Sequence, residues 1–278
     1  MVATPIGNLE DVTLRALRVL READLIACED TRQTAKLLAH YQIQRPTTSY
    51  HEHNETEKAA VLLKELEAGK QIALVSDAGT PCISDPGYRI VHRARELHIP
   101  VVPIPGPCSF VAALSASGQP ADVFTFLGFL PARKGARAKL LETLKDEQRT
   151  LIFFESPERL LESLGEIGRI FGQRFLTVAR ELTKIYEELF SGTPQDCMDY
   201  FGRKTIKGEI VLIISPGWRD NASIESLDMT LVRQRFATLT ETRQVSRTDA
   251  VKKLARELKV SRRALYSLLL EDSDQRSS

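Results

Sequence analysis

Short apolar runs alternate with amphipathic segments along the first 120 residues. The runs LIACE (25–29), QIALVS (71–76) and VVPI (101–104) have the length and composition of buried strands. Apolar residues recur at helical spacing in the other segments, at residues 13–22, 55–67, 87–97 and 109–117. This alternation predicts a mostly parallel sheet covered on both faces, and such sheets bind ligands at the carboxyl ends of their strands.

The following segment, residues 122–215, is richer in strands. The predicted strands are FTFLGFL (124–130), TLIFFE (150–155), FLTVARE (175–181), YEELF (186–190) and EIVLII (209–214), with one long helix at 157–171. Because crossover helices are few, we expect this sheet to be mixed or largely antiparallel. We therefore predict an α/β protein with a parallel-rich domain at residues 1–120, a mixed-sheet domain at 121–216 and a small helical domain at 224–278.

The last fifty residues contain helical patterns only. Ser246 and Asp249 begin a predicted helix, a turn follows at 260–261, and Arg262 and Arg263 open a second helix, an arrangement typical of a helix-turn-helix. Residues 230–270 carry ten Lys and Arg against three Asp and Glu, a charge of +7 in a chain whose net charge is +1. A basic end of this kind favours contact with phosphate, although a solvated helical face has the same composition.

Composition places the chain among folded proteins. Apolar residues make up 42% and charged residues 27% of the 278 positions, whereas a disordered chain has fewer apolar residues. No apolar run approaches the ~20 residues that a membrane span needs. The four cysteines are far apart and form no C-x-x-C pair, so neither a zinc site nor a disulfide framework is predicted. We expect a cytoplasmic protein that has no membrane partner.

Three loops rich in Gly and Pro follow predicted strands: the very short Met1–Ala3, then QIALVS and VVPI. They are TPIGN (4–8), SDAGTPCISDPG (76–87) and PGPCS (105–109). Any one of them is explained by the turns that a βα fold requires. Together, at one edge of a sheet, they favour a small-molecule site in which bare backbone approaches the ligand. Neither a P-loop nor a dinucleotide-binding G-x-G-x-x-G motif is present, so the ligand chemistry stays open at this point.

Long ordered motifs resemble the tetrapyrrole-methylase family, and within it the members that methylate ribosomal RNA. They are TPIGNLEDVTLRAL, EDTRQTAKLL, ALVSDAGTPCISDPGYRIV, PIPGPCS, LIFFESPERL, ARELTKIYEE and AVKKLARELKVSRRALY. The resemblance implies two α/β domains with S-adenosylmethionine between them, often in a homodimer. It also implies 2′-O-methylation of a cytidine in the decoding centre of 16S rRNA, within a small ribosomal subunit. A precorrin-type C-methyltransferase and a helix-turn-helix DNA-binding regulator are the alternatives.

The resemblance also assigns a set of cofactor-binding residues. They come from the three loops and from two strands of the second sheet: Pro5, Gly7, Ser76, Asp77, Ala78, Gly79, Thr80, Ile83, Pro107, Ser109, Phe154, Glu155 and Ala179.

Methyl transfer to a ribose hydroxyl requires alignment with the donor and a group that takes the proton. The segment 29–32 lies at the end of a predicted strand and is expected to face the cleft. We predict that a carboxylate among Asp30, Glu155 and Glu181 orients or deprotonates the hydroxyl, and that Arg32 and Arg180 hold phosphate or these carboxylates. The alternative is that these residues form structural ion pairs.

Basic residues in two segments are candidates for RNA contact. PARKGARAK (131–139) is expected to be a mobile loop whose Arg133, Lys134, Arg137 and Lys139 bind RNA phosphates, together with Arg262 and Arg263 near the end of the chain. His51 and His53 alternate as metal ligands on a strand would, but no third ligand stands at a suitable spacing. We predict no metal site.

Overall fold

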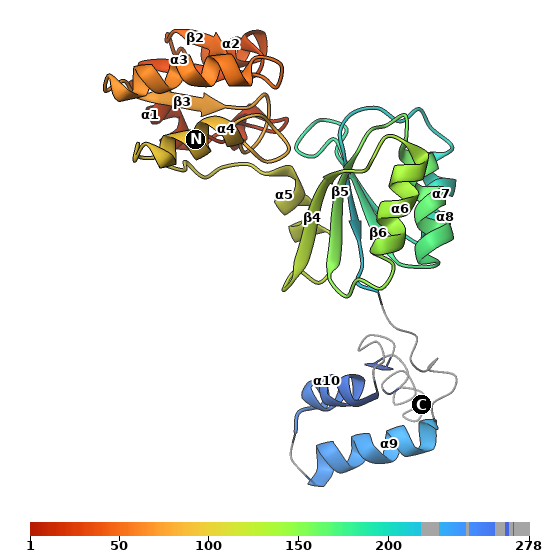
Figure 1. The fold of residues 1–278 in the computed structure, drawn as a ribbon. Coiled ribbons are helices and arrows are strands. Elements are labelled where there is room, and N and C mark those ends of the chain that lie inside the picture. The colour runs from red at the N-terminus through yellow and green to blue at the C-terminus, as the bar shows by residue number, and fades with distance from the viewer. Residues whose placement is uncertain (218–227, 243–244, 259–264, 267–268, 270–278) are drawn as a thin grey trace. The chain divides into compact units, whose positions relative to one another are not determined.

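The first sheet has three parallel strands with helices on both faces, as the apolar pattern predicts (Figure 1). Side chains alternate across a strand, so Ile26 and Cys28 pack with two of the helices and Ala27 packs with the other two. The strands, in the order β2-β1-β3, are β1 (Leu25–Cys28), β2 (Thr47–Ser49) and β3 (Ile72–Val75). The first face is covered by α1 (Leu14–Glu22) and α2 (Thr31–His40), after a 3₁₀ turn at Leu9–Asp11, and the second by α3 (Glu55–Glu67) and α4 (Tyr88–Glu96).

The prediction of a strand at residues 101–104 is wrong. Ile104 alone pairs, through an isolated parallel bridge to Val2. Pro103 has no amide hydrogen to donate to a ladder, and Val102 is exposed. The segment is therefore a connection in which one residue touches the sheet.

The second sheet has five strands and is mixed, as expected. Only β4 and β5 are parallel; the remaining pairs are antiparallel. The central strand IVLII is buried along its whole length because helices cover both faces of the sheet. The order is β4-β5-β8-β6-β7, with β4 (Phe124–Phe129), β5 (Thr150–Glu155), β6 (Leu176–Arg180), β7 (Glu188–Gly192) and β8 (Ile210–Ile214). The helices on one face are α6 (Lys134–Thr143), α7 (Leu160–Phe171) and α8 (Pro194–Phe201).

The other face of this sheet is covered by α5 (Ser109–Ala116), which precedes residue 120 in the chain. Ala113 and Leu114 pack against Ile152, Val211 and Ile213. The α/β class with one parallel and one mixed sheet is thus confirmed. The domain boundary at residue 120 stays a prediction.

The computed structural model describes residues 1–217, 228–242, 245–258, 265–266 and 269. They belong to two units, which are considered separately: residues 1–145 with 149–216, and residues 146–148 with the chain from 217 onward. Both sheets lie in the first unit. Among the described residues, no helix is long and apolar enough to pass through a bilayer.

The second unit has a small helical core. Asp228 caps its first helix by accepting from two amides, and Ser246 accepts a 3.1 Å hydrogen bond from the Asp249 amide, which is the helix start that the sequence predicts. Arg262 and Arg263 lie outside the described residues. The helices are α9 (Met229–Ala237), a π-helical turn at Thr238–Thr242 and α10 (Arg247–Leu258), around the buried Val232, Leu239, Ala250, Val251, Leu254, Ala255, Leu265 and Leu269.

Candidate active site

A cavity of about 410 Å³ opens at the carboxyl ends of β1, β3 and β5 within the first unit. Glu29, which the sequence places at the cleft, is one of its walls. Predicted cofactor residues that line it are Asp77, Ala78, Gly79, Thr80, Ile83, Ser109, Phe154 and Glu155. The remaining lining residues were not predicted: Ile6, Ser84, Asp85, Cys108, Phe129, Ser156, Pro157, Gly208, Glu209, Ile210 and Val211.

A second cavity, of about 590 Å³, lies against α1, β3 and α4. Its walls are mainly aliphatic, and they include none of the residues predicted to bind cofactor, catalyse or contact RNA. The first cavity is lined by eight of the predicted cofactor residues and by Glu29, so that cavity is the candidate site.

Direct backbone contacts join the three loops at one edge, as predicted. Thr4 and Gly79 exchange two hydrogen bonds, of 2.9 and 3.0 Å, and the Thr80 hydroxyl donates to the Pro107 carbonyl at 3.0 Å. Gly79 has φ +80°, and a Cβ there would stand 3.2 Å from Ile6 Cγ2. Only glycine fits without strain at this point of the cavity wall.

Five of the predicted cofactor residues do not line the cavity: Pro5, Gly7, Ser76, Pro107 and Ala179. Gly7 lies so close to the turn after β6 that a Cβ would overlap the side chain of Lys184. The TPIGN loop is thereby packed against the second sheet.

Glu155 lines the cavity but its carboxylate is engaged by the protein. It is 2% exposed and accepts from the Ser156 amide at 2.7 Å, from Arg159 at 2.7 Å and from the Ser163 hydroxyl. These bonds fix the turn at Ser156 after β5. Glu155 therefore shapes the wall, and three of the roughly four acceptor sites of its carboxylate are already used.

Asp30 and Arg32 form an ion pair next to the cavity. Asp30 caps α2, accepting from the Arg32 amide at 2.8 Å, and its carboxylate binds the Arg32 guanidinium at 2.7 Å. The hydrogen bonds from Arg32 lower the pKa of Asp30 to about 2. Neither side chain lines the cavity, although the Asp30 amide donates to Asp77 Oδ1 at 2.9 Å. A carboxylate so acidic is a weak proton acceptor.

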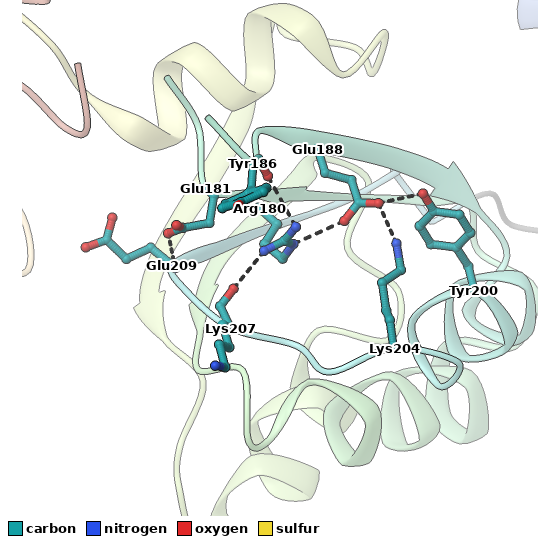
Figure 2. A network of polar contacts seen from close by, with 8 residues as sticks. All are labelled: Arg180, Glu181, Tyr186, Glu188, Tyr200, Lys204, Lys207 and Glu209. Carbon is teal, nitrogen blue, oxygen red and sulfur yellow. Dashed lines mark hydrogen bonds and ion pairs between the residues drawn. The ribbon is translucent and has the colours of Figure 1, made fainter. Parts of the chain in front are cut away.

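Arg180 is held in a polar network on β6 and β7 (Figure 2). It donates to Glu188 at 3.1 Å and to the carbonyls of Lys207 and Tyr186 at 3.0 and 3.2 Å. Burial alone would raise the pKa of Glu188, but hydrogen bonds from Lys204, Tyr200 and Arg180 outweigh it and hold the pKa at about 2.

Glu181, the residue after Arg180, binds a neighbouring lysine and the backbone at Glu209. It accepts from Lys184 at 2.7 Å and from the Glu209 amide at 3.1 Å. Burial acts to raise the pKa of Glu181, but the Lys184 hydrogen bond and the backbone of Glu209 lower it overall. Because Gly208 and Glu209 line the cavity and Arg180 and Glu181 do not, this pair acts on the site by holding the 207–209 segment.

Three carboxylates face the cavity from the first sheet: those of Glu29, Asp77 and Asp85. Burial raises the pKa of Glu29, and repulsion from Asp77 and Asp85 adds to that rise. Burial also raises the pKa of Asp85, and the charge of Asp77 adds to that rise. Carboxyl groups with raised pKa values in a cavity are candidates for proton transfer.

The expected mobile loop at 131–139 is wrong, because α6 begins at Lys134. Arg133, Lys134 and Lys139 are exposed, as RNA contact requires. Arg137 is fully buried and binds Glu166 at 2.6 Å and Glu162 at 2.9 Å on α7. Its charge is paired with these two carboxylates between α6 and α7. Arg137 therefore cannot bind RNA phosphates, contrary to the prediction.

Arg137→Ala is expected to lower the free energy of unfolding by about 3–5 kcal/mol, because it leaves the Glu166 carboxylate buried without its partner. Arg133→Ala is the matched control on the exposed surface and should change stability by less than about 0.5 kcal/mol. Chemical denaturation of both variants checks this. Equal stability of the two would show that Arg137 is not the structural partner of α7.

The cavity suits S-adenosylmethionine in shape and charge. Glycine backbone at Gly79 leaves room along one wall, aliphatic side chains of Ile6 and Val211 offer an apolar surface for an adenine, and carboxylates match a sulfonium and an ammonium. Among the described residues, no cluster of three or more His, Cys, Asp or Glu has the geometry of a metal site.

Comparison with known proteins gives concordant results. Residues 1–197 match the family model described as Tetrapyrrole (Corrin/Porphyrin) Methylases. A relative from Synechocystis sp. named "Ribosomal RNA small subunit methyltransferase I" is 48% identical, over 98% of this chain and 96% of its own. A relative of the same name from Mesorhizobium japonicum is 47% identical, over 99% and 92%. The solved uroporphyrin-III C-methyltransferase of Thermus thermophilus has a TM-score of 0.54 at 21% identity, covering 77% of this chain and 92% of that one, which is a likeness of fold.

Proposed function

This chain belongs to the tetrapyrrole methylase family, and on that premise we propose that it methylates the RNA of the small ribosomal subunit. The family uses S-adenosylmethionine as its methyl donor. The observation that carries the proposal is 48% and 47% identity, over nearly the whole chain, to two relatives named "Ribosomal RNA small subunit methyltransferase I". The cavity supports it with a glycine backbone wall and the half-buried carboxylates of Glu29 and Asp85. The finer proposal is transfer to the 2′-oxygen of a cytidine in the decoding centre of 16S rRNA.

The bound donor supplies a methyl group that its sulfonium already activates, so the chain must align a hydroxyl and accept its proton. We assign the proton acceptor to Glu29. Its carboxylate lines the cavity, and its pKa is raised by burial and by two neighbouring carboxylates. Asp30 is held by Arg32 and Glu155 by three donors, so neither is as free to take a proton.

The other residues of the site position this chemistry. Glu155 and Arg159 fix the turn that carries Ser156, and the Thr4–Gly79 bridge fixes the opposite wall. Excluding water from the space between these walls keeps the carboxylate basic. Arg133 and Lys134 are exposed directly after β4 and supply positive charge for RNA phosphates.

Deleting residues 224–278 is expected to weaken RNA binding and to flatten its salt dependence, because these residues contain the whole of the +7 segment 230–270. Affinity for S-adenosylmethionine should stay unchanged, since the whole cavity belongs to the other unit. RNA binding by fluorescence anisotropy at several salt concentrations, with calorimetry for the donor, checks this. A variant that replaces the exposed Arg247, Lys252 and Lys253 by Gln keeps the helical unit and should reproduce part of the loss.

The decisive experiment for the function uses tritiated S-adenosylmethionine. Small ribosomal subunits from cells that lack this protein and the corresponding naked RNA are incubated with the full chain. Label in one cytidine whose 3′ linkage resists alkali would support 2′-O transfer and identify the substrate form. Donor binding without any label in RNA would overturn the proposal and favour a small-molecule methylase, such as one that acts on precorrins.

A further inference from the structure

The end of β4 is irregular next to the cavity. Its register with β5 shifts between Phe126 and Phe129, which is a β-bulge, and Gly128 within it has φ +65°. A Cβ on Gly128 would stand 3.3 Å from the Ser84 hydroxyl, so the bulge packs against the loop that lines the opposite wall. Bulges beside active sites re-aim a side chain. Here the side chain that follows the bulge is Phe129.

Phe129 is an aromatic ring left open to solvent in the cavity wall. It is 58% exposed and lies edge to face with Phe154, with ring centroids 5.3 Å apart. Phe154 is braced by Phe126 at 5.0 Å, and Phe126 stacks on Phe110 at 4.3 Å. Phe129 therefore ends an aromatic row that begins with Phe110 on α5, and it is the most exposed ring of that row that lines the cavity.

Two exposed cationic side chains follow Phe129 within five residues of the chain. Arg133 and Lys134 begin α6 four and five residues after Phe129, and both are exposed. An aromatic platform beside basic side chains is the arrangement by which proteins hold single-stranded nucleic acid: bases stack on rings while cations follow the phosphates. The chemistry that fits Phe129 is therefore a nucleobase.

We propose that Phe129 is the stacking platform for the base of the target nucleotide, which is turned out of its RNA stack to reach the cavity. This inference rests on the proposed RNA substrate. The adenine of the methyl donor is the other source of a base. The ring's exposure and its position in the chain, a few residues before the basic start of α6, favour the RNA base, because that base arrives from solvent together with its phosphates.

The test compares four variants in the full chain, with small subunits as substrate. Phe129→Ala should raise KM for the subunit by about 5- to 100-fold, in line with base–aromatic stacking energies. Phe129→Leu, which keeps an apolar side chain without a ring, should show most of that loss, and Phe129→Trp should restore near wild-type KM. Phe124→Ala is the matched control, because Phe124 begins the same strand, is 39% exposed and does not line the cavity.

Calorimetric titration of S-adenosylmethionine without RNA shows whether Phe129 stacks on the adenine of the donor or on a base of the RNA. Unchanged donor affinity in Phe129→Ala supports the proposal, and its loss would assign the ring to the donor adenine and overturn it. An unchanged KM, or a Phe129→Leu variant as good as wild type, would also overturn it. Failure of the wild-type chain to methylate RNA would contradict the proposed function itself, whereas only the ratios between variants test Phe129.

Discussion

Gly79→Val is expected to weaken binding of S-adenosylmethionine by about 100-fold, because overpacking of the cavity wall costs about 3 kcal/mol in the bound state. Gly79 has φ +80°, and even a Cβ would press on Ile6 at 3.2 Å. The added methyl groups must enter the cavity or displace Ile6, which is itself part of the wall. Calorimetric titration of the donor measures the effect.

Gly69→Val is the control variant: it introduces the same kind of backbone strain, but its side chain presses on no neighbouring atom. Gly69 has φ +89°, but nothing lies within 4 Å of a Cβ at that position. Both variants should lose thermal stability to a similar degree, and only Gly79→Val should lose the donor. Wild-type donor affinity in Gly79→Val would refute the placement of the cofactor against this loop.

Glu29→Gln is expected to lower kcat by about 10²- to 10⁴-fold while leaving donor affinity nearly unchanged, because the amide cannot take the hydroxyl proton. Turnover by the wild-type chain should rise with pH, since Glu29 acts only when deprotonated. Burial and the charges of Asp77 and Asp85 raise its pKa, so this rise should occur at higher pH than for an exposed glutamate. Single-turnover rates across a pH series check both statements.

Asp30→Asn is the comparison that decides between the two adjacent carboxylates. Asparagine still caps a helix, so α2 should be kept, and Asp30 does not line the cavity. We expect Asp30→Asn to retain most of the turnover and the acidic limb of the pH profile. If it instead abolishes turnover while Glu29→Gln does not, the proton acceptor is Asp30.

The arrangement of the loops was predictable because local chemistry dictates it. Gly and Pro at 4–8, 76–87 and 105–109 can only be turns, and alternating strands and helices bring such turns to one sheet edge. The helical spacing was equally accessible: α3 occupies the predicted residues 55–67, and α1 covers 14–22 of the predicted 13–22, with Thr13 as its N-cap.

What the sequence could not predict depends on contacts between distant residues. Arg137 is buried only because Glu162 and Glu166, a turn apart on α7, meet it from across the helix pair. Phe129 turns into the cavity because of a bulge, and the signal available for it was Gly128 inside an apolar strand. Asp85 belongs to a loop already singled out, but its place in the cavity follows from the course of that loop after Ile83.

Helix α5 joins the two sheets mechanically. The loop before it is tied to the first sheet through Thr80 and Pro107, whereas Ala113 and Leu114 are packed into the second sheet. Between these attachments lies Cys108, which is itself in the cavity wall. A rotation of one sheet against the other about this connection would therefore change the shape of the cavity wall at Cys108.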